Sequence, residues 1–171
     1  MEYKILPATQ EDIPALNKLV NSAYRGESSR KGWTTEADLI DGTRLDETVL
    51  RELFNDNRTT ILKYIEAGQI LGCVELRKEK GNVYLGMLTV QPDLQAKGIG
   101  KKLLFAGEAF ARENDSKKMF MTVVSIRTKL IEWYERHGYQ LTGERKPFNM
   151  PDERFGIPKQ PLEFVVLEKV L

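Results

Sequence analysis

Two glycines and three lysines gather in one short stretch whose spacing suits the binding of an anion. The stretch reads Gln95-Ala96-Lys97-Gly98-Ile99-Gly100 and is followed by Lys101 and Lys102. A strand is expected before it and a helix directly after it, so unpaired N–H groups and the positive end of a helix dipole meet there. Glycines let the backbone approach oxygen atoms that a Cβ would block. These residues therefore predict a phosphate-binding loop.

Two better-known phosphate loops fit this stretch less well. No third glycine follows Gly100 to complete a dinucleotide-binding fingerprint, and no Gly-Lys-Ser/Thr ending marks a nucleoside triphosphate loop. Taken alone, the glycines also suit an ordinary strand-to-helix turn with solvated lysines. The surrounding elements have to decide between these interpretations.

The elements that must position this loop are predicted from hydrophobic periodicity and turn signals. β-Branched runs predict strands, apolar residues at helical spacing predict amphipathic helices, and glycines and prolines mark the breaks. The predicted strands are 2–6, 59–65, 70–76, 83–90, 118–124, 139–143 and 162–170, and the predicted helices are 9–24, 35–41, 46–55, 98–114 and 127–136. Segment 144–161 holds four prolines and Gly156, and is expected to be irregular over most of its length. This order favours an α/β fold, with an α+β mixed sheet flanked by helices.

Composition narrows the class of protein. The 171 residues fit a single domain, 1–171, and 26 Lys+Arg against 25 Asp+Glu leave a net charge of +1, so neither nucleic acid nor an anionic membrane is expected as a partner. No apolar run approaches the ~20 residues of a membrane span and no signal-peptide core is present, so we expect a cytoplasmic protein. Cys73 is the only cysteine and His137 the only histidine, so no metal site is expected.

The glycine loop in its predicted setting resembles the acetyl-coenzyme A signature of the Gcn5-related N-acetyltransferase (GNAT) superfamily, Gln-x-x-Gly-x-Gly. The resemblance covers residues ~70–143 and includes Leu88-Thr89-Val90 before the loop, the strand 121–125 and the segment from Leu130 to Tyr139. It implies a central mixed β-sheet of about seven strands that splays between two central parallel strands, 83–90 and 118–124. It also implies acetyl-CoA as the cofactor and an amine as the acceptor.

The resemblance further implies which residues hold the cofactor. In the family, pantetheine pairs with strand backbone and the pyrophosphate lies on the N–H groups of the loop. The cofactor-binding residues expected on this basis are Leu88, Thr89, Val90, Gln95, Ala96, Lys97, Gly98, Ile99, Gly100 and Lys101. Arg127 stands where many relatives have an asparagine, and it either contacts the cofactor or caps the helix that follows. A bulky replacement of either loop glycine is expected to abolish cofactor binding.

Two side chains are the candidates for proton transfer. The leaving thiolate benefits from a proton, and Tyr134 matches the family's tyrosine, four residues before Gly138 and five before Tyr139. The alternative is that Tyr134 packs on the sheet with its hydroxyl bonded to backbone. A protonated amine must lose a proton before it attacks, and Glu75 on a central strand is the candidate base. A solvent-facing position is the alternative for Glu75.

A polar loop that starts at Arg25 is rich in residues that recognise ligands. In the resembled fold this region arches over the acceptor pocket. The residues expected to contact the acceptor are the aromatic Tyr24 and Trp33, the carboxylates of Glu36 or Asp38, and the guanidinium groups of Arg25 or Arg30. Mixed charges of this kind suggest an amino-acid-like or polyamine-like amine. A solvated connection is the alternative interpretation.

The function favoured by these residues is an N-acetyltransferase that moves an acetyl group from acetyl-CoA to the primary amine of a small molecule by direct attack. A protein N-terminus or a lysine is the alternative acceptor. A non-catalytic acetyl-CoA sensor would keep the glycine loop and lose the chemistry, and the presence of Tyr134 favours the enzyme. Another phosphate-ligand binder would need the loop without the tyrosine helix. Dimers are frequent in the family, but no residue here marks an interface.

Overall fold

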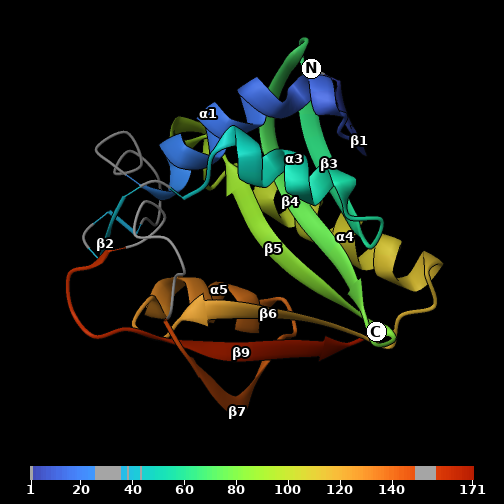
Figure 1. Ribbon diagram of the computed structural model, residues 1–171. Coiled ribbons are helices and arrows are strands. Elements are labelled where there is room, and N and C mark those ends of the chain that lie inside the picture. Colours follow the sequence, from blue (N-terminus) through green and yellow to red (C-terminus); the bar gives the residue numbers. More distant parts are fainter. Residues whose placement is uncertain (1, 26–35, 38, 43, 149–156) are drawn as a thin grey trace.

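Figure 1 shows the computed structural model, which describes residues 2–25, 36–37, 39–42, 44–148 and 157–171. The strands are β1 (Tyr3–Pro7), β2 (Ile40–Asp41), β3 (Thr59–Glu66), β4 (Gln69–Glu79), β5 (Asn82–Val90), β6 (Lys118–Val124), β7 (Gln140–Pro147), β8 (Ile157–Pro158) and β9 (Glu163–Val170). The helices are α1 (Ile13–Tyr24), α3 (Glu47–Asn55), α4 (Ile99–Glu113) and α5 (Thr128–Arg136), with short 3-10 helices at Gln10–Asp12 and Pro92–Leu94.

A seven-stranded sheet with the order β1-β3-β4-β5-β6-β9-β7 forms the centre of the molecule. All neighbours are antiparallel except β5 and β6, which run parallel and pair only at Val83–Met119 and Tyr84–Phe120. Beyond these pairs the two strands separate, and Figure 1 shows β5 and β6 diverging from their common end near the C-terminus. The expected mixed sheet, splayed between two central parallel strands, is confirmed.

Side-chain alternation along β4 divides the interior into two cores. Cys73 packs with α1 and α3 on one face of the sheet, whereas its neighbour Val74 packs with α4 and α5 on the other. Gly107 of α4 permits close approach, because a Cβ there would lie 3.1 Å from a methyl group of Leu76. Both faces of the central strands are therefore covered, which explains why 70–76 and 83–90 read as nearly continuous apolar runs.

A β-bulge interrupts the pairing of β4 with β5 just where β5 leaves β6. The register shifts between Cys73 and Glu75, and Met87 opposite them has a positive φ of 54°. The Leu88 carbonyl does not extend this ladder and instead accepts a hydrogen bond from the Tyr24 hydroxyl at the end of α1 (2.9 Å). Bulges occur preferentially next to active sites because they redirect backbone groups and side chains. This one lies in the part of β5 that β6 leaves unpaired.

Two expectations about the flanks were wrong in part. Residues 35–41 were expected to be helical, but Glu36 and Ala37 lie in a turn and Ile40–Asp41 forms β2, paired with β8; positions 35 and 38 lie outside the described residues. β7 runs on to Pro147 rather than ending at 143, because a register shift around Gly143 (φ 88°) lets it continue along β9. Both features depend on partners that are distant in sequence, which local patterns do not report.

The described helices include none that is long and apolar enough to cross a membrane. The described part of the chain likewise contains no cluster of three or more His, Cys, Asp or Glu side chains that could hold a metal ion.

Candidate active site

The glycine loop connects the end of β5 to the start of α4. Gly98 is the N-cap of α4 in the left-handed conformation (φ 88°, ψ 0°), and Ala96 also has a positive φ of 65°. The Gln95 side-chain amide donates to the Val90 carbonyl (3.1 Å), which ties the loop to β5. Lys102 is the first residue of the described helix whose N–H reaches a main-chain carbonyl, that of Gly98 (3.1 Å). The N–H groups before it are left at the positive end of the α4 dipole, as an anion site requires.

The two glycines of this loop serve different purposes. At Gly98 an added Cβ would meet nothing within 4 Å, so this glycine is needed for its left-handed backbone. At Gly100 a Cβ would lie 3.7 Å from both Trp133 and Val90, an ordinary contact. Gly100 therefore leaves space in the adjoining cleft that a side chain would fill, while Gly98 allows the left-handed turn.

A cleft of about 290 Å³ opens between this loop, the end of β5 and α5. Its lining consists of Leu88, Val90, Gln95, Ala96, Gly98, Gly100, Lys101, Leu130, Trp133 and His137. One end offers N–H groups and an exposed lysine, and the rest is mostly apolar. These residues fit an elongated ligand with phosphate at one end, as in coenzyme A.

Four other residues that were expected to bind the cofactor, Thr89, Lys97, Ile99 and Arg127, do not line this cleft. Thr89 is buried with its hydroxyl bonded to the Met87 carbonyl (2.8 Å), and Ile99 points into the core. Lys97 is exposed beside the cleft but does not line it. Arg127 does not line it either; with Thr89 it lines a small neighbouring cavity, and it also lines a larger cavity between β5 and β6.

An aromatic wall of this cleft was missed by sequence reasoning. The rings of Trp133 and His137 have centroids 4.4 Å apart, and His137 Nδ1 lies 2.7 Å from the Trp133 carbonyl. The two residues are four positions apart on α5 and so share one helix face. That spacing could have identified the wall from the sequence.

A second cavity of about 270 Å³ lies on the other side of the splay, between β5 and β6. Its polar lining includes Tyr24, Arg25, Glu36, Arg44, Tyr84, Arg127 and Tyr134. Leu88 and Leu130 line both this second cavity and the cofactor cleft. A small cavity of about 60 Å³ shares Leu88, Leu130 and Tyr134 with the second cavity. The two large spaces thus adjoin at Leu88 and Leu130, and Tyr134 lies on the side of the second cavity. Arg44 and Tyr84 carry no motif that marks them in the sequence.

Tyr134 is buried, with 5% of its surface exposed, and its ring packs edge-on against Trp133 and Tyr139. Burial raises the pKa of Tyr134 well above the ordinary tyrosine value, so the hydroxyl keeps its proton at neutral pH. That hydroxyl makes no hydrogen bond to any residue that the structure describes. Among the described residues, the Tyr134 hydroxyl is therefore not bonded to a backbone group, which was the alternative prediction.

Glu75 lies on β4 directly opposite Gly86 of β5 and is only 6% exposed, so the solvent-facing alternative is wrong. A Cβ at Gly86 would stand 3.0 Å from Glu75 Oε1, which means that the glycine makes room for the carboxylate. Arg77 Nη1 donates to Glu75 Oε2 (3.3 Å). Burial raises the pKa of Glu75, and Arg77 and Arg44 partly oppose this effect. The carboxylate itself lines none of the cavities of this site, but it lies against Gly86, which lines the space between β5 and β6.

A buried ionic network crosses the mouth of the second cavity. Arg25 Nε donates to Glu36 Oε1 (2.8 Å), and Arg127 Nη1 donates to Glu36 Oε2 (3.0 Å). Arg25 and Glu36, which were predicted to contact the acceptor, line this cavity but bind each other, and Arg127 joins them at the start of α5. Trp33, Asp38 and Arg30, also expected to contact the acceptor, lie outside the described residues.

Comparison with known families identifies the enzyme class of this two-sided site. Residues 34–151 match the family model of the acetyltransferase (GNAT) domain. The chain belongs to the GNAT family. It is therefore an acetyltransferase, and acetyl-CoA is its cofactor. No curated protein sequence matches the chain.

Solved structures of GNAT proteins share the whole fold at low sequence identity. The ribosomal-protein-S18-alanine N-acetyltransferase of Escherichia coli is 13% identical with a TM-score of 0.75, over 99% of this chain and 94% of that one. The ribosomal-protein-alanine N-acetyltransferase of Brucella melitensis is 21% identical (TM-score 0.71; 98% and 99% covered). The PaiA N-acetyltransferase of Thermoplasma acidophilum, in complex with coenzyme A, is 15% identical (TM-score 0.72; all of both chains covered). At these identities the likeness establishes the GNAT fold.

Proposed function

We propose that this acetyltransferase acts on the primary amine of a small molecule, which attacks directly from the cavity between β5 and β6. The observation that carries the proposal is that Tyr134 lines both the second cavity and the small cavity, and that the small cavity shares Leu88, Val90, Gln95 and Leu130 with the cofactor cleft. No described residue is bonded to the Tyr134 hydroxyl. A proton donor is thus available where two substrates can meet.

Bound acetyl-CoA supplies the acetyl thioester that the amine attacks. In this proposal, the N–H groups from Ala96 to Lys101 and the α4 dipole bind its pyrophosphate. The backbone of Leu88 and Val90, at the part of β5 that β6 leaves unpaired, binds the pantetheine amides. Leu130 and Trp133 cover the apolar part of the cleft.

Proton transfer is assigned to Tyr134 and Glu75. Tyr134 is protonated at neutral pH and donates to the departing sulfur. Glu75 accepts the proton that the acceptor ammonium loses, and its raised pKa brings it closer to the pH at which a base is effective. Positive charge around the cavity assists this step because it disfavours the ammonium form of the acceptor.

The size of the second cavity supports a small acceptor. At about 270 Å³ it lies near the lower end of the roughly 300–1,000 Å³ typical of small-ligand sites. The neighbours named for ribosomal proteins make a protein N-terminus the second candidate acceptor, but they share only the fold with this chain. Thiol release from acetyl-CoA with a panel of small amines and a panel of peptides distinguishes the two.

The test of the catalytic assignment is Tyr134→Phe. We expect kcat to fall by about 10²–10⁴-fold, the usual contribution of a general acid, with unchanged affinity for coenzyme A by calorimetry. Tyr139→Phe is the matched control, since this buried tyrosine donates to Glu108 (2.8 Å) and lines neither space. Full activity in Tyr134→Phe would refute the acid role. Turnover with peptides only would refute the small acceptor, and no turnover with any amine would indicate a sensor.

A further inference from the structure

Hydrogen bonds to α1 position the backbone of Arg44 at the second cavity. It lies in the turn between β2 and α3, and its N–H donates to Asn21 Oδ1 on α1 (2.7 Å). The Asn21 side chain also bonds both the N–H (3.2 Å) and the carbonyl (3.0 Å) of Leu45. Asp46 then caps α3 through the Val49 N–H (2.9 Å). The backbone of Arg44 is thus hydrogen-bonded to α1 just before α3 begins, which fixes the point from which its side chain extends to the cavity.

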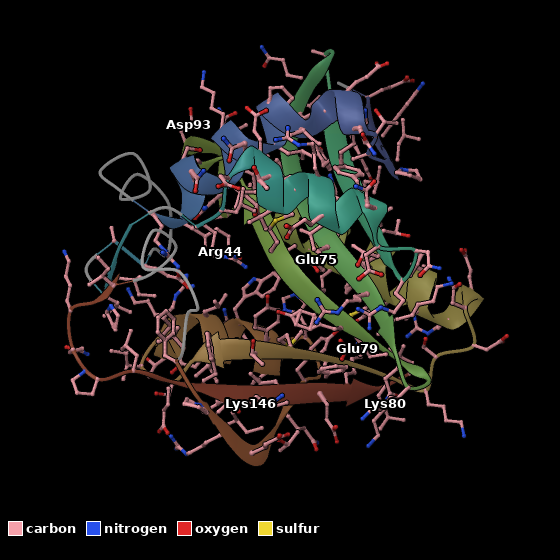
Figure 2. The ribbon with its side chains drawn as sticks, in the orientation of Figure 1. Arg44, Glu75, Glu79, Lys80, Asp93 and Lys146 are labelled. Carbon is pink, nitrogen blue, oxygen red and sulfur yellow. The ribbon has the colours of Figure 1, made fainter. Side chains whose placement is uncertain are left out.

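The guanidinium of Arg44 lines the cavity and lies 5.3 Å from the centroid of the Tyr24 ring. This cation–π contact orients the group without neutralising it. Throughout the ranges that the structure describes, Arg44 forms no ion pair, and its side chain forms no hydrogen bond. In Figure 2 Arg44 stands below α1 and α3 at the wide end of the splay.

The other charged groups around the cavity are already paired. Arg25 and Arg127 both donate to Glu36, and each of its two carboxylate oxygens is used. The described lining holds three arginines and one glutamate, so positive charge exceeds negative charge by two. Such a cavity attracts an anion and repels a ligand with several positive charges.

We propose that Arg44 binds a carboxylate of the acceptor, so that the substrate is an amino acid or another small amine bearing a carboxylate, and not a polyamine. The proposal rests on the function proposed above and deepens it. A guanidinium presents two parallel N–H donors that match a carboxylate, and such charge-assisted pairs are stronger than neutral hydrogen bonds. Once bound, the carboxylate offsets part of the excess positive charge and leaves the amine end of the molecule free for the reaction.

The experiment compares matched acceptors in the thiol-release assay. Free amino acids are tested against their carboxamides, which keep the amine and side chain but lose the negative charge, and against spermidine and putrescine. Rates are compared per concentration of unprotonated amine, because the amide group lowers the pKa of the neighbouring amine. The expected result is a kcat/KM at least tenfold higher for the best carboxylate than for its carboxamide, and no turnover of the polyamines.

Variants of Arg44 then test the residue itself. Removing a hydrogen-bond partner of a charged group costs about 1.5–3 kcal/mol, which corresponds to roughly a 10–150-fold higher KM for the carboxylate in Arg44→Gln. The KM for the carboxamide and the affinity for coenzyme A should stay the same, and Arg44→Lys should recover part of the loss. Arg51→Gln, on the exposed surface of α3, is the control and should leave all constants unchanged.

Each outcome decides the proposal. Equal or better turnover of carboxamides or polyamines by the wild-type enzyme overturns it while leaving the proposed function intact. So does an Arg44→Gln variant that keeps its preference for the carboxylate. No turnover of any small amine, with coenzyme A still bound, refutes the proposed function and this inference with it. The wild-type comparison remains decisive even if Arg44→Gln does not fold.

Discussion

The cofactor cleft and the second cavity lie on opposite sides of one splay, but they are built from different parts of the chain. The cleft is formed by one continuous strand, loop and helix, from Leu88 to Lys101, with α5 as its second wall. The cavity collects side chains from α1, the turn before α3, β5, β6 and α5. Its polar groups come from positions as far apart as Tyr24 and Tyr134.

The difference teaches how each side obtains its specificity. The cleft offers N–H groups and a helix dipole, which any sequence with the right backbone provides, so it suits a cofactor common to the family. The cavity depends on which charged side chains meet there and how they pair. Glu36 forms ion pairs with two arginines, whereas Arg44 forms none within the described part of the chain and contacts the Tyr24 ring. Substitutions should therefore affect the two sides in separable ways.

The largest effect is expected from Glu36→Ala, which breaks the network of the cavity. Its removal leaves Arg25 and Arg127 without this buried partner, and losing one member of a buried ion pair costs about 3–5 kcal/mol. We expect a loss of this size in the free energy of unfolding, measured by urea denaturation. The exposed Glu47, 3.9 Å from Arg51, is the control, and Glu47→Ala should change stability by less than about 1 kcal/mol. Equal losses in both would show that the network does not hold the cavity together.

A smaller effect is expected from Glu75→Gln, which removes the proposed base but keeps a side chain of nearly the same size. The raised pKa of Glu75 means that the base is protonated at low pH, so wild-type kcat/KM should rise as pH increases through that pKa. We expect Glu75→Gln to lower kcat/KM by about 10²-fold, near 2.7 kcal/mol, and to remove this rise from the pH profile. Calorimetry should show unchanged coenzyme A affinity. A retained acid limb in the variant would assign the base elsewhere.

The smallest effect is expected from Gly98→Ala on the cofactor side. There is room for the methyl group, but a left-handed φ costs a residue with a Cβ about 1–2 kcal/mol. If the loop must hold this conformation to bind phosphate, coenzyme A affinity should fall by up to about tenfold. Gly143 on β7 also has a φ of 88° and open space around it, so Gly143→Ala is the matched control. It should lose similar stability and no affinity, whereas equal affinities in both variants would contradict a strict backbone role for Gly98.

The sequence by itself determined the order of the elements and the phosphate loop. Apolar periodicity marked all seven strands of the main sheet, and Gly98 and Gly100 between a strand and a helix marked the loop, because both signals are local. The 3-10 helix at Pro92–Leu94 and the bulge at Met87 do not disturb that order. The same local signals failed at 35–41, where β2 pairs with β8 more than a hundred residues away.

Only the tertiary structure decided how the charged side chains pair. Arg25, Glu36 and Arg44 stand within twenty positions of one another, and nothing in their spacing tells that the first two bind each other while the third lines a cavity. Arg127, ninety-one positions after Glu36, completes the network. Pairing of charges depends on distances of a few ångströms between elements brought together by packing, and a one-dimensional pattern does not encode those distances.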